Sequence, residues 1–596
     1  MSHQGLPALV RPGRIFTPSL LFFLIVTGYG LLWTTLPVNG FWINDNGLKF
    51  IQLQAFQQNR FRAFYIPWQG EALDPDFQTA PIQAPFGKTL NGNLFVSYPP
   101  LFALISVLPY RLFGMSGLYL LPLLGAFLLF WTVQRLGETV CQNPARASGA
   151  GKTALLLVAL ASPVAFYSFT FWEHTLALAF CCQSLLAGAR YCRSPGPGHL
   201  AAAGLFAGLA VCFRTDAYLF AGAVGLGIWW AAGFRWREAA VFIGGLLMVL
   251  VPLWLFQLWA CGHMLGLHLQ SQGWERLTPA LYLSQRLTVA AKLMLNMHAD
   301  PLISALLAAP FLLAAALSWK KFRLDRLPVV LLALAVLTGC LVLSGHLLSS
   351  QPIMRLLFTN GLFSVSPILI LGFLAHAVNS RDADPAAGHG FPSGLCPNPP
   401  AGQSRLRPYH FLLLVLLANA LAYTALVPEV NSMGLHWGCR FLLIAYPILC
   451  CLSAPVIVCL WYQRPGKTGL TRTLILLAAG VSLTQQVYAL ELLWQRKQFS
   501  TELTSQIRRF NPDIIITPDW YLPHDLAQVF FEQPIFLVKD YGALNSVIRR
   551  ARGNHIDQAV FISRRNAGPL PENAVCLSDG SLNFCPVMIW RQPLKT

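Results

Sequence analysis

The chain has 596 residues, of which 55% are hydrophobic and only 11% are charged, whereas an average soluble domain is about 25% charged. So few charged side chains cannot cover a water-exposed surface, which excludes the ordinary soluble classes of protein. The formal net charge of +18 does not indicate nucleic acid binding, because Lys and Arg fall in short clusters between apolar runs rather than along one stripe. The composition therefore predicts a polytopic membrane protein.

Apolar runs recur along the chain, and a helix of about 20 apolar residues crosses a hydrocarbon core of about 30 Å. A shorter run at residues 101–113 follows Tyr98, Pro99 and Pro100, and we assign it to the membrane interface, because the basic loops then share one side. With that choice we predict about 13 spans. They lie at residues 16–36, 118–133, 154–168, 175–188, 200–212, 217–232, 239–260, 301–317, 328–347, 356–377, 411–426, 441–460 and 474–493.

The basic loops predict the orientation of the protein. Arg11 and Arg14 precede the first run, and no small-residue cleavage site follows it, so we interpret the run as an anchor with a cytoplasmic N-terminus. The basic segments 135–152, 190–193, 235–237, 320–326, 381–407 and 464–472 then all lie in the cytoplasm. An odd number of spans places the C-terminal tail outside, in the periplasm if the protein lies in a bacterial inner membrane.

Two domains are expected along the chain. Residues 1–494 form the transmembrane domain, with a first external loop at 37–114 that carries interfacial helices. Residues 495–596 read as a soluble external α/β domain, with short buried strands near 514–517, 535–538 and 559–562 and helices near 526–532 and 544–552. The fold class is thus mainly α, a transmembrane helix bundle with a small C-terminal α/β domain.

Two familiar patterns are weak in this chain. Its 14 cysteines do not form a disulfide scaffold, and only Cys576 and Cys585 in the soluble tail are candidates for a disulfide pair. The segment Gly149-Ala150-Gly151-Lys152-Thr153 resembles part of a phosphate-binding loop, but Arg146 replaces the required glycine and no strand precedes it.

Asp45 lies just beyond the first span, in the first external loop. A carboxylate at this depth has apolar surroundings, which suits a general base. The alternative is a structural Asp that caps a horizontal helix running from Gly47 toward Phe56.

Glu173 and His174 form a short external turn between two apolar runs. Ionisable groups next to hydrocarbon are costly, which favours catalysis or binding of a polar substrate. Capping of the following helix is the alternative.

Two further external segments carry candidate ligands of a phosphate. The loop 261–300 contains His268 and Arg276, and the last external turn ends in Trp437-Gly438-Cys439-Arg440. The planar fork of Arg matches phosphate oxygens, whereas a solvated loop or a snorkelling side chain is the alternative for each of them.

Together these positions resemble the GT-C membrane glycosyltransferases, and above all bacterial members related to the aminoarabinose and protein-mannose transferases. The likeness rests on an acid in a long first external loop, a Pro-Pro-Leu at an interfacial helix, a second acid in the next external turn and a soluble external tail. It implies Asp45 as the catalytic base, Glu173 as a second catalytic carboxylate, and Tyr98, Pro99, Pro100, Trp437 and Arg440 as substrate-binding residues. From their external positions we add His174, His268 and Arg276 to the candidate substrate-binding residues. Asn44 and Asn46 flank Asp45 where relatives often have an acidic pair.

The resemblance implies transfer of a sugar from a polyprenyl-phosphate donor to a glycan, lipid or protein acceptor at the bilayer, without nucleic acid. No cofactor is certain, and a divalent cation stays open. A lipid-linked glycan ligase or polymerase, a transporter or flippase, and a scaffold without catalysis are the alternatives. The external position of the charged residues argues against a transporter, whose sites lie near the midplane.

Overall fold

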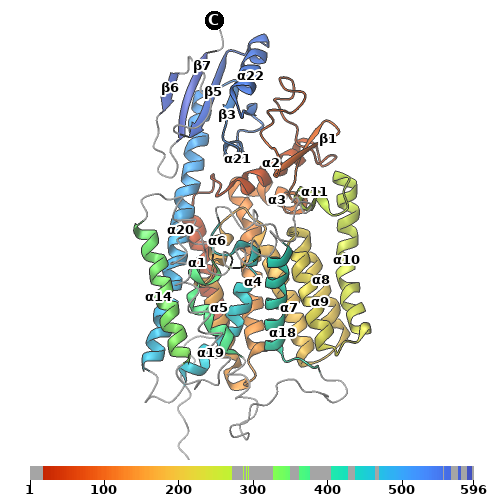
Figure 1. Cartoon of the computed structure of the whole chain (residues 1–596), viewed down its shortest axis with the longest axis vertical. Coiled ribbons are helices and arrows are strands. Elements are labelled where there is room, and N and C mark those ends of the chain that lie inside the picture. The colour runs from red at the N-terminus through yellow and green to blue at the C-terminus, as the bar shows by residue number, and fades with distance from the viewer. Residues whose placement is uncertain are drawn as a thin grey trace, which may run out of the picture.

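The computed structural model describes residues 18–271, 286, 290, 293, 327–348, 361–375, 404–426, 436–462, 469–554, 556–564, 575–578 and 587–593. Most of them form a helix bundle, and a small sheet lies beyond one end of it (Figure 1). The bundle contains α1 (Pro18–Thr35), α4 (Leu120–Val140), α5 (Pro144–Leu160), α6 (Val164–Ser168), α7 (His174–Arg193), α8 (Pro197–Phe213), α9 (Ala217–Ala231), α10 (Trp236–Cys261), α14 (Leu327–Leu348), α16 (Leu362–Val365), the 3-10 helix η3 (Pro367–Leu374), α18 (Pro408–Leu426), the 3-10 turn η5 (Arg440–Leu442), α19 (Ala445–Trp461) and α20 (Gly469–Phe510).

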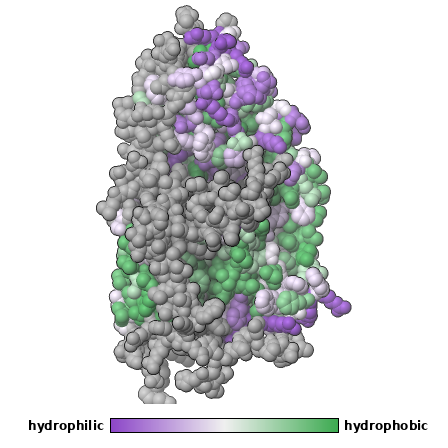
Figure 2. All heavy atoms as spheres, viewed as in Figure 1, coloured by the Kyte–Doolittle hydropathy of each residue, from purple (hydrophilic) through white to green (hydrophobic). Residues whose placement is uncertain are grey.

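Many large apolar side chains lie on the outside of the bundle. Within the described part of the chain, five helical segments are long and apolar enough to cross a membrane, and four more helices are apolar but shorter. Leu255 and Leu421 are 63% and 71% exposed, and Figure 2 shows hydrophobic side chains over much of the bundle. Such a surface is typical of helices that face lipid. The count of about 13 spans stays a prediction, and the run 301–317 lies outside the described residues.

Two predicted spans are divided. The described part of the run 356–377 contains the separate helices α16 and η3. The run 154–168 forms α5, which ends at Leu160, and the separate short helix α6, which begins at Val164. Pro163 lies at the start of α6, where a proline fits the first turn of a helix but cannot continue the preceding one.

Several short elements gather at the end of the bundle that faces the sheet (Figure 1). In the predicted first external loop these are α2 (Asn44–Gln58), the antiparallel strands β1 (Gly87–Leu90) and β2 (Asn93–Val96), and α3 (Pro100–Phe113). The 3-10 helix η1 (Gly114–Tyr119) separates α3 from α4, and α11 (Gly266–Ser271) follows α10. This end therefore collects the loops that carry the candidate site residues.

The C-terminal sheet has the strand order β4-β3-β5-β7-β6. Strand β3 pairs in parallel with β4 and β5, whereas β7 pairs antiparallel with β5 and β6. The strands are β3 (Ile514–Thr517), β4 (Ile535–Leu537), β5 (Gln558–Arg564), β6 (Val575–Ser578) and β7 (Val587–Pro593). The three strands expected from the sequence are present, and β6 and β7 extend the sheet.

The helices beside this sheet differ in part from the prediction. The predicted helix 544–552 is α22 (Tyr541–Gly553), whereas the helix predicted at 526–532 is wrong. That segment forms successive turns in which Val529 N–H bonds Leu526 and Glu532 N–H bonds Val529, and the helical piece is α21 (Leu522–Asp525). Leu526, Val529 and Phe530 are all buried, so tertiary packing overrides helix propensity here.

Helix α20 runs without a break through position 494, where we expect the soluble domain to begin. The sheet itself starts at Ile514. The disulfide between Cys576 and Cys585 stays a prediction, because Cys585 lies outside the described residues.

Candidate active site

The site is built on the first turn of α2. Ile43 is the N-cap, and the side chain of Asn46 accepts hydrogen bonds from the backbone N–H groups of Trp42 (3.2 Å) and Ile43 (3.4 Å). Asn46 also donates to the carbonyl of Phe171 at 3.0 Å, which ties the helix to the turn before α7. Asn46, rather than Asp45, therefore accepts the hydrogen bonds of the backbone N–H groups at the start of this helix. The carboxylate of Asp45 does not cap the helix and can have another role.

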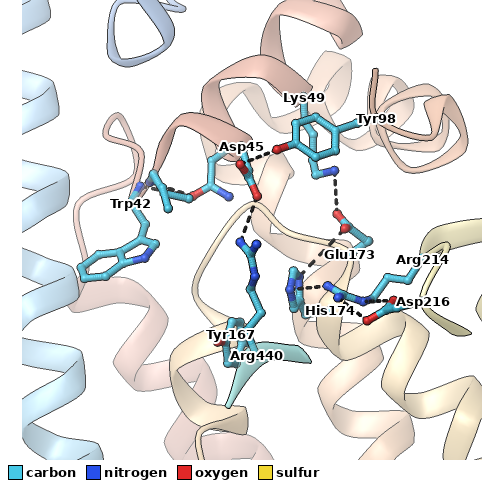
Figure 3. Close-up of polar contacts among 12 residues, drawn as sticks. Trp42, Asp45, Lys49, Tyr98, Tyr167, Glu173, His174, Arg214, Asp216 and Arg440 are labelled. Carbon is cyan, nitrogen blue, oxygen red and sulfur yellow. Dashed lines mark hydrogen bonds and ion pairs between the residues drawn. The ribbon is translucent and has the colours of Figure 1, made fainter. Parts of the chain in front are cut away.

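Asp45 joins two distant parts of the chain. The hydroxyl of Tyr98 donates to Oδ1 at 2.6 Å, and Nη1 of Arg440 donates to Oδ2 at 3.1 Å. Asp45 is 6% exposed, and Figure 3 shows both partners converging on its carboxylate. The structure thus brings together three residues that the sequence analysis selected from separate segments.

Tyr98 is fixed by the prolines that follow it. Pro99 is the N-cap of α3 and Pro100 its first residue, positions where the restricted φ of proline suits the start of a helix. The carbonyl of Tyr98 accepts from Nε2 of Gln52 at 3.2 Å. Burial, followed by the nearby Asp45, raises the pKa of Tyr98 well above its ordinary value, so its hydroxyl stays protonated as a donor.

A tight turn at Gly438 positions Arg440. Gly438 has φ +62°, and a Cβ there would approach the Tyr446 hydroxyl to 2.5 Å, so the turn requires glycine. The Arg440 guanidinium lies 5.0 Å from the ring centre of Trp172 and 4.5 Å from that of Phe441. These aromatic faces hold the cation beside Asp45.

Trp437 has a supporting position. Its indole N–H donates to Gln486 at 3.2 Å, and its carbonyl accepts from Tyr167 at 2.8 Å. The side chain is fully buried, and its role in substrate binding stays a prediction.

Glu173 forms a buried ion pair with Lys49 of α2. The distance from Nζ to Oε2 is 3.0 Å, and the two side chains are 1% and 8% exposed. The Lys49 ammonium also lies 4.3 Å from the ring centre of Tyr98. The second predicted acid is therefore joined to the Asp45 cluster through Lys49.

His174 connects this cluster to a third charged group. Nη1 of Arg214 contacts Nε2 of His174, and the guanidinium pairs with Asp216 at 2.9 and 2.6 Å. The ring of His174 stacks on that of Tyr167 with centres 4.9 Å apart. Figure 3 shows the resulting row of alternating charges.

Lys49, Arg214 and Asp216 are site residues that were not predicted from the sequence. The sequence pattern could have identified Arg214 and Asp216. They lie in a charged turn between two apolar runs, which the predicted topology places on the same side of the membrane as Glu173. Lys49 has no comparable signal, since it lies within an ordinary polar helix.

Two cavities are each lined by one of the residues that bind the Asp45 carboxylate. The Arg214 cavity is lined in part by His174, Arg214, Asp216, Asn419, Tyr423 and Arg440. The Gln257 cavity is lined in part by Gln52, Ser97, Tyr98, Thr215, Gln257 and His268. Arg440 belongs to the first and Tyr98 to the second, so each oxygen of Asp45 contacts a residue of a different cavity.

The remaining predicted ligands are divided between this region and the undescribed part of the chain. His268 lines the Gln257 cavity, and its ring centre is 5.5 Å from that of Tyr98. Burial lowers the pKa of His268 to about 4, which leaves the ring neutral near pH 7. Arg276 lies outside the described residues. Pro99 and Pro100 line the Gln257 cavity.

A divalent cation does not fit the donors found here. Among the described residues no group of three or more His, Cys, Asp and Glu side chains comes together. Both oxygens of Asp45 face hydrogen-bond donors, whereas hard cations prefer several oxygen ligands.

No protein-family model matches the sequence, and no curated protein sequence matches it. Among solved structures, the oligosaccharyltransferase of Archaeoglobus fulgidus, tethered to an acceptor peptide with the NVT sequon, superposes with a TM-score of 0.50 and 12% identity. The match covers 90% of this chain and 68% of that one. The chain has the GT-C fold.

ArnT from Cupriavidus metallidurans, solved with undecaprenyl phosphate, is similar with a TM-score of 0.47 and 11% identity, over 96% of this chain and 98% of that one. The similarity to the Archaeoglobus fulgidus oligosaccharyltransferase confirms the predicted resemblance to GT-C enzymes at the level of the fold. The mainly helical bundle with its small C-terminal mixed sheet also agrees with the predicted class.

Proposed function

We propose that this GT-C protein is a membrane glycosyltransferase that moves a sugar from a polyprenyl-phosphate donor to a glycan, lipid or protein acceptor. The observation that carries the proposal is the buried carboxylate of Asp45, held between the Tyr98 hydroxyl and the Arg440 guanidinium at 2.6 and 3.1 Å. Such a carboxylate suits a general base, and the adjacent cation suits a departing phosphate.

In the proposed reaction, Asp45 accepts the proton of an acceptor hydroxyl. The acceptor oxygen then forms a bond to the anomeric carbon of the sugar, while the bond from that carbon to the phosphate oxygen breaks. The polyprenyl phosphate leaves with the bonding electron pair, and Arg440 stabilises its charge. Arg214 supports the same role, because it lines the Arg214 cavity together with Arg440.

We further propose that the end of the bundle next to the C-terminal sheet faces the outside, in the periplasm of a bacterial cell. The basic loops support this orientation, since they fall at the other ends of the predicted spans. The charged residues of the site gather near the sheet end (Figures 1 and 3), which favours an interfacial enzyme over a transporter with a midplane site.

The test replaces Asp45 by Asn, which preserves volume but removes the proton acceptor. We expect transfer of radiolabelled sugar to envelope acceptors to fall by about 10²–10⁴-fold. Asp76→Asn is the matched control, because Asp76 is an exposed acid of the same loop. Normal transfer by a well-expressed Asp45→Asn protein would contradict the assignment.

The mass of lipid-linked and envelope glycans in cells without the protein separates the proposal from its main rival. Loss of one sugar unit supports transfer of a single sugar. Loss of an entire polymer supports a ligase or polymerase.

A further inference from the structure

The Gln257 cavity contains buried polar atoms that have no hydrogen-bond partner among the described residues. These are Oε1 of Gln52, Oγ of Ser97 and Oε1 of Gln257. The three residues line the same cavity and are only 3%, 3% and 4% exposed. A buried polar group without a partner costs about 1–3 kcal/mol. Three such groups around one cavity indicate that a polar ligand supplies their missing hydrogen bonds.

The types of atom define the chemistry of this ligand. Two of the three are amide oxygens, which only accept hydrogen bonds, and the hydroxyl of Ser97 both donates and accepts. The amide nitrogen of Gln52 already donates to the carbonyl of Tyr98 at 3.2 Å. A matching ligand therefore presents O–H or N–H donors to this cavity.

The described lining of this cavity offers no cation that would balance an anion. None of its described lining residues is Lys or Arg, and burial lowers the pKa of His268 to about 4, so its ring is neutral near pH 7. Phe64, Phe95 and Leu267 supply apolar surface beside the polar groups. This combination suits a sugar ring, which has hydroxyl groups at its edge and C–H groups on its faces.

The position of the cavity connects it to the proposed reaction. Tyr98 lines it and donates its hydroxyl to Oδ1 of Asp45. Arg440, in turn, lines the Arg214 cavity and donates to Oδ2. The turn between α8 and α9 forms part of both walls, because Thr215 lines the Gln257 cavity whereas Arg214 and Asp216 line the other.

We propose that the Gln257 cavity binds an uncharged sugar ring through Gln52, Ser97 and Gln257, while the Arg214 cavity takes the anionic part of the donor. This inference rests on the proposed function for its place in the reaction. The ring belongs either to the donor or to the acceptor, since both supply the same hydroxyl chemistry.

Binding is tested first without any transfer reaction. Saturation-transfer NMR on the purified full-length protein in detergent would compare uncharged methyl glycosides of several hexoses and pentoses with the anionic methyl glucuronide. We expect at least one uncharged glycoside to bind, and Gln257→Leu and Ser97→Ala each to weaken it by about tenfold, the loss of one buried hydrogen bond. Gln533→Leu is the matched control, because Gln533 is a buried glutamine of the C-terminal domain whose Oε1 also has no partner.

Three results would overturn the proposal. The first is binding of no uncharged glycoside, which would mean that water alone completes the polar atoms. The second is equal binding by wild type and Gln257→Leu, and the third is preference for the glucuronide.

Kinetics of transfer then identify the source of the ring. A raised KM for the lipid-linked donor assigns the cavity to the donor sugar, and a raised KM for the acceptor assigns it to the acceptor. Unchanged KM values for both would refute a substrate site. If Asp45→Asn transfers sugar normally while Gln257→Leu still loses glycoside binding, the proposed mechanism fails but the sugar site stands.

Discussion

The backbone carbonyl of His524 lies directly against Gly47, with no room between them for a Cβ atom on the glycine. Gly47 belongs to the first turns of α2, two residues after Asp45, and His524 belongs to α21 beside the C-terminal sheet. The C-terminal region therefore contacts the helix that carries the proposed base. A nearby buried pair between Arg496 and Asp525, with distances of 2.6 and 2.7 Å, connects α20 to α21.

Gly47→Ala should displace α2 from α21, because the added methyl group overlaps a backbone atom that cannot rotate away. Overpacking of this kind costs about 1–3 kcal/mol. We expect a lower Tm for the purified protein and slower sugar transfer. Gly553→Ala is the control, since a Cβ at that position has no atom within 4 Å. Equal Tm values for the two variants would refute the proposed contact.

Lys49→Met should leave the buried carboxylate of Glu173 without its cation. Removing one partner of a buried ion pair costs about 3–5 kcal/mol. Arg508→Met is the comparison, because Arg508 pairs with Glu532 at 2.6 Å but both side chains are about half exposed, 49% and 48%, where a pair contributes about 0–1 kcal/mol. Thermal unfolding measures both. A Lys49→Met protein that also carries Glu173→Gln should recover part of the lost stability.

Arg440→Lys should weaken use of the lipid-linked donor although the charge is kept. Lysine lacks the planar fork and cannot stack between Trp172 and Phe441 in the same way. We expect KM for the donor to rise by roughly tenfold or more, consistent with loss of one charge-assisted hydrogen bond. Arg472→Lys near the start of α20, where Arg472 contacts the ring of Trp461, should leave KM unchanged. An unaltered KM for Arg440→Lys would indicate a snorkelling side chain.

Stability should decrease in mild acid because of His524. Burial lowers the pKa of His524 to about 4, against an ordinary value of 6.5. Between these two pH values the unfolded chain binds more protons than the folded protein, so the free energy of unfolding rises with pH. The contribution of His524 to that free energy is complete above about pH 6.5. The shift corresponds to about 3 kcal/mol. The decrease in Tm from pH 7 to pH 5 should be smaller in His524→Phe than in wild type. An equal decrease in both proteins would contradict the role of His524.

The sequence predicted the parts of the fold that depend on local patterns. Apolar runs identified most helices, and short β-branched segments identified β3, β4 and β5. The expected start of the soluble domain rested on the polar stretch Gln495-Arg496-Lys497-Gln498. All four residues are good helix formers, and no Gly or Pro interrupts them before Pro512, so polarity changes there without ending the helix.

The site was predictable only in part, because some of its contacts join residues that lie far apart in the sequence. Asp45, Tyr98 and Arg440 stand in recognisable segments, and their contact supports the common site that the resemblance implies. Lys49 pairs with Glu173 across a large sequence separation. The Gln257 cavity is lined from α2, α3, α10 and α11, and the Arg214 cavity from α7, α9 and α18. Such contacts depend on tertiary packing, which no local pattern encodes.

Helix α20 fixes the sheet to the bundle by its length. Its 42 residues extend for roughly 63 Å at 1.5 Å per residue, about twice the hydrocarbon thickness of a bilayer. Each residue added to or removed from such a helix would rotate the sheet by about 100°, and α21 would lose its alignment with α2. Homologous proteins that keep this arrangement should therefore vary in the length of their loops but tolerate insertions in α20 only as near-integral numbers of turns, such as seven or eleven residues.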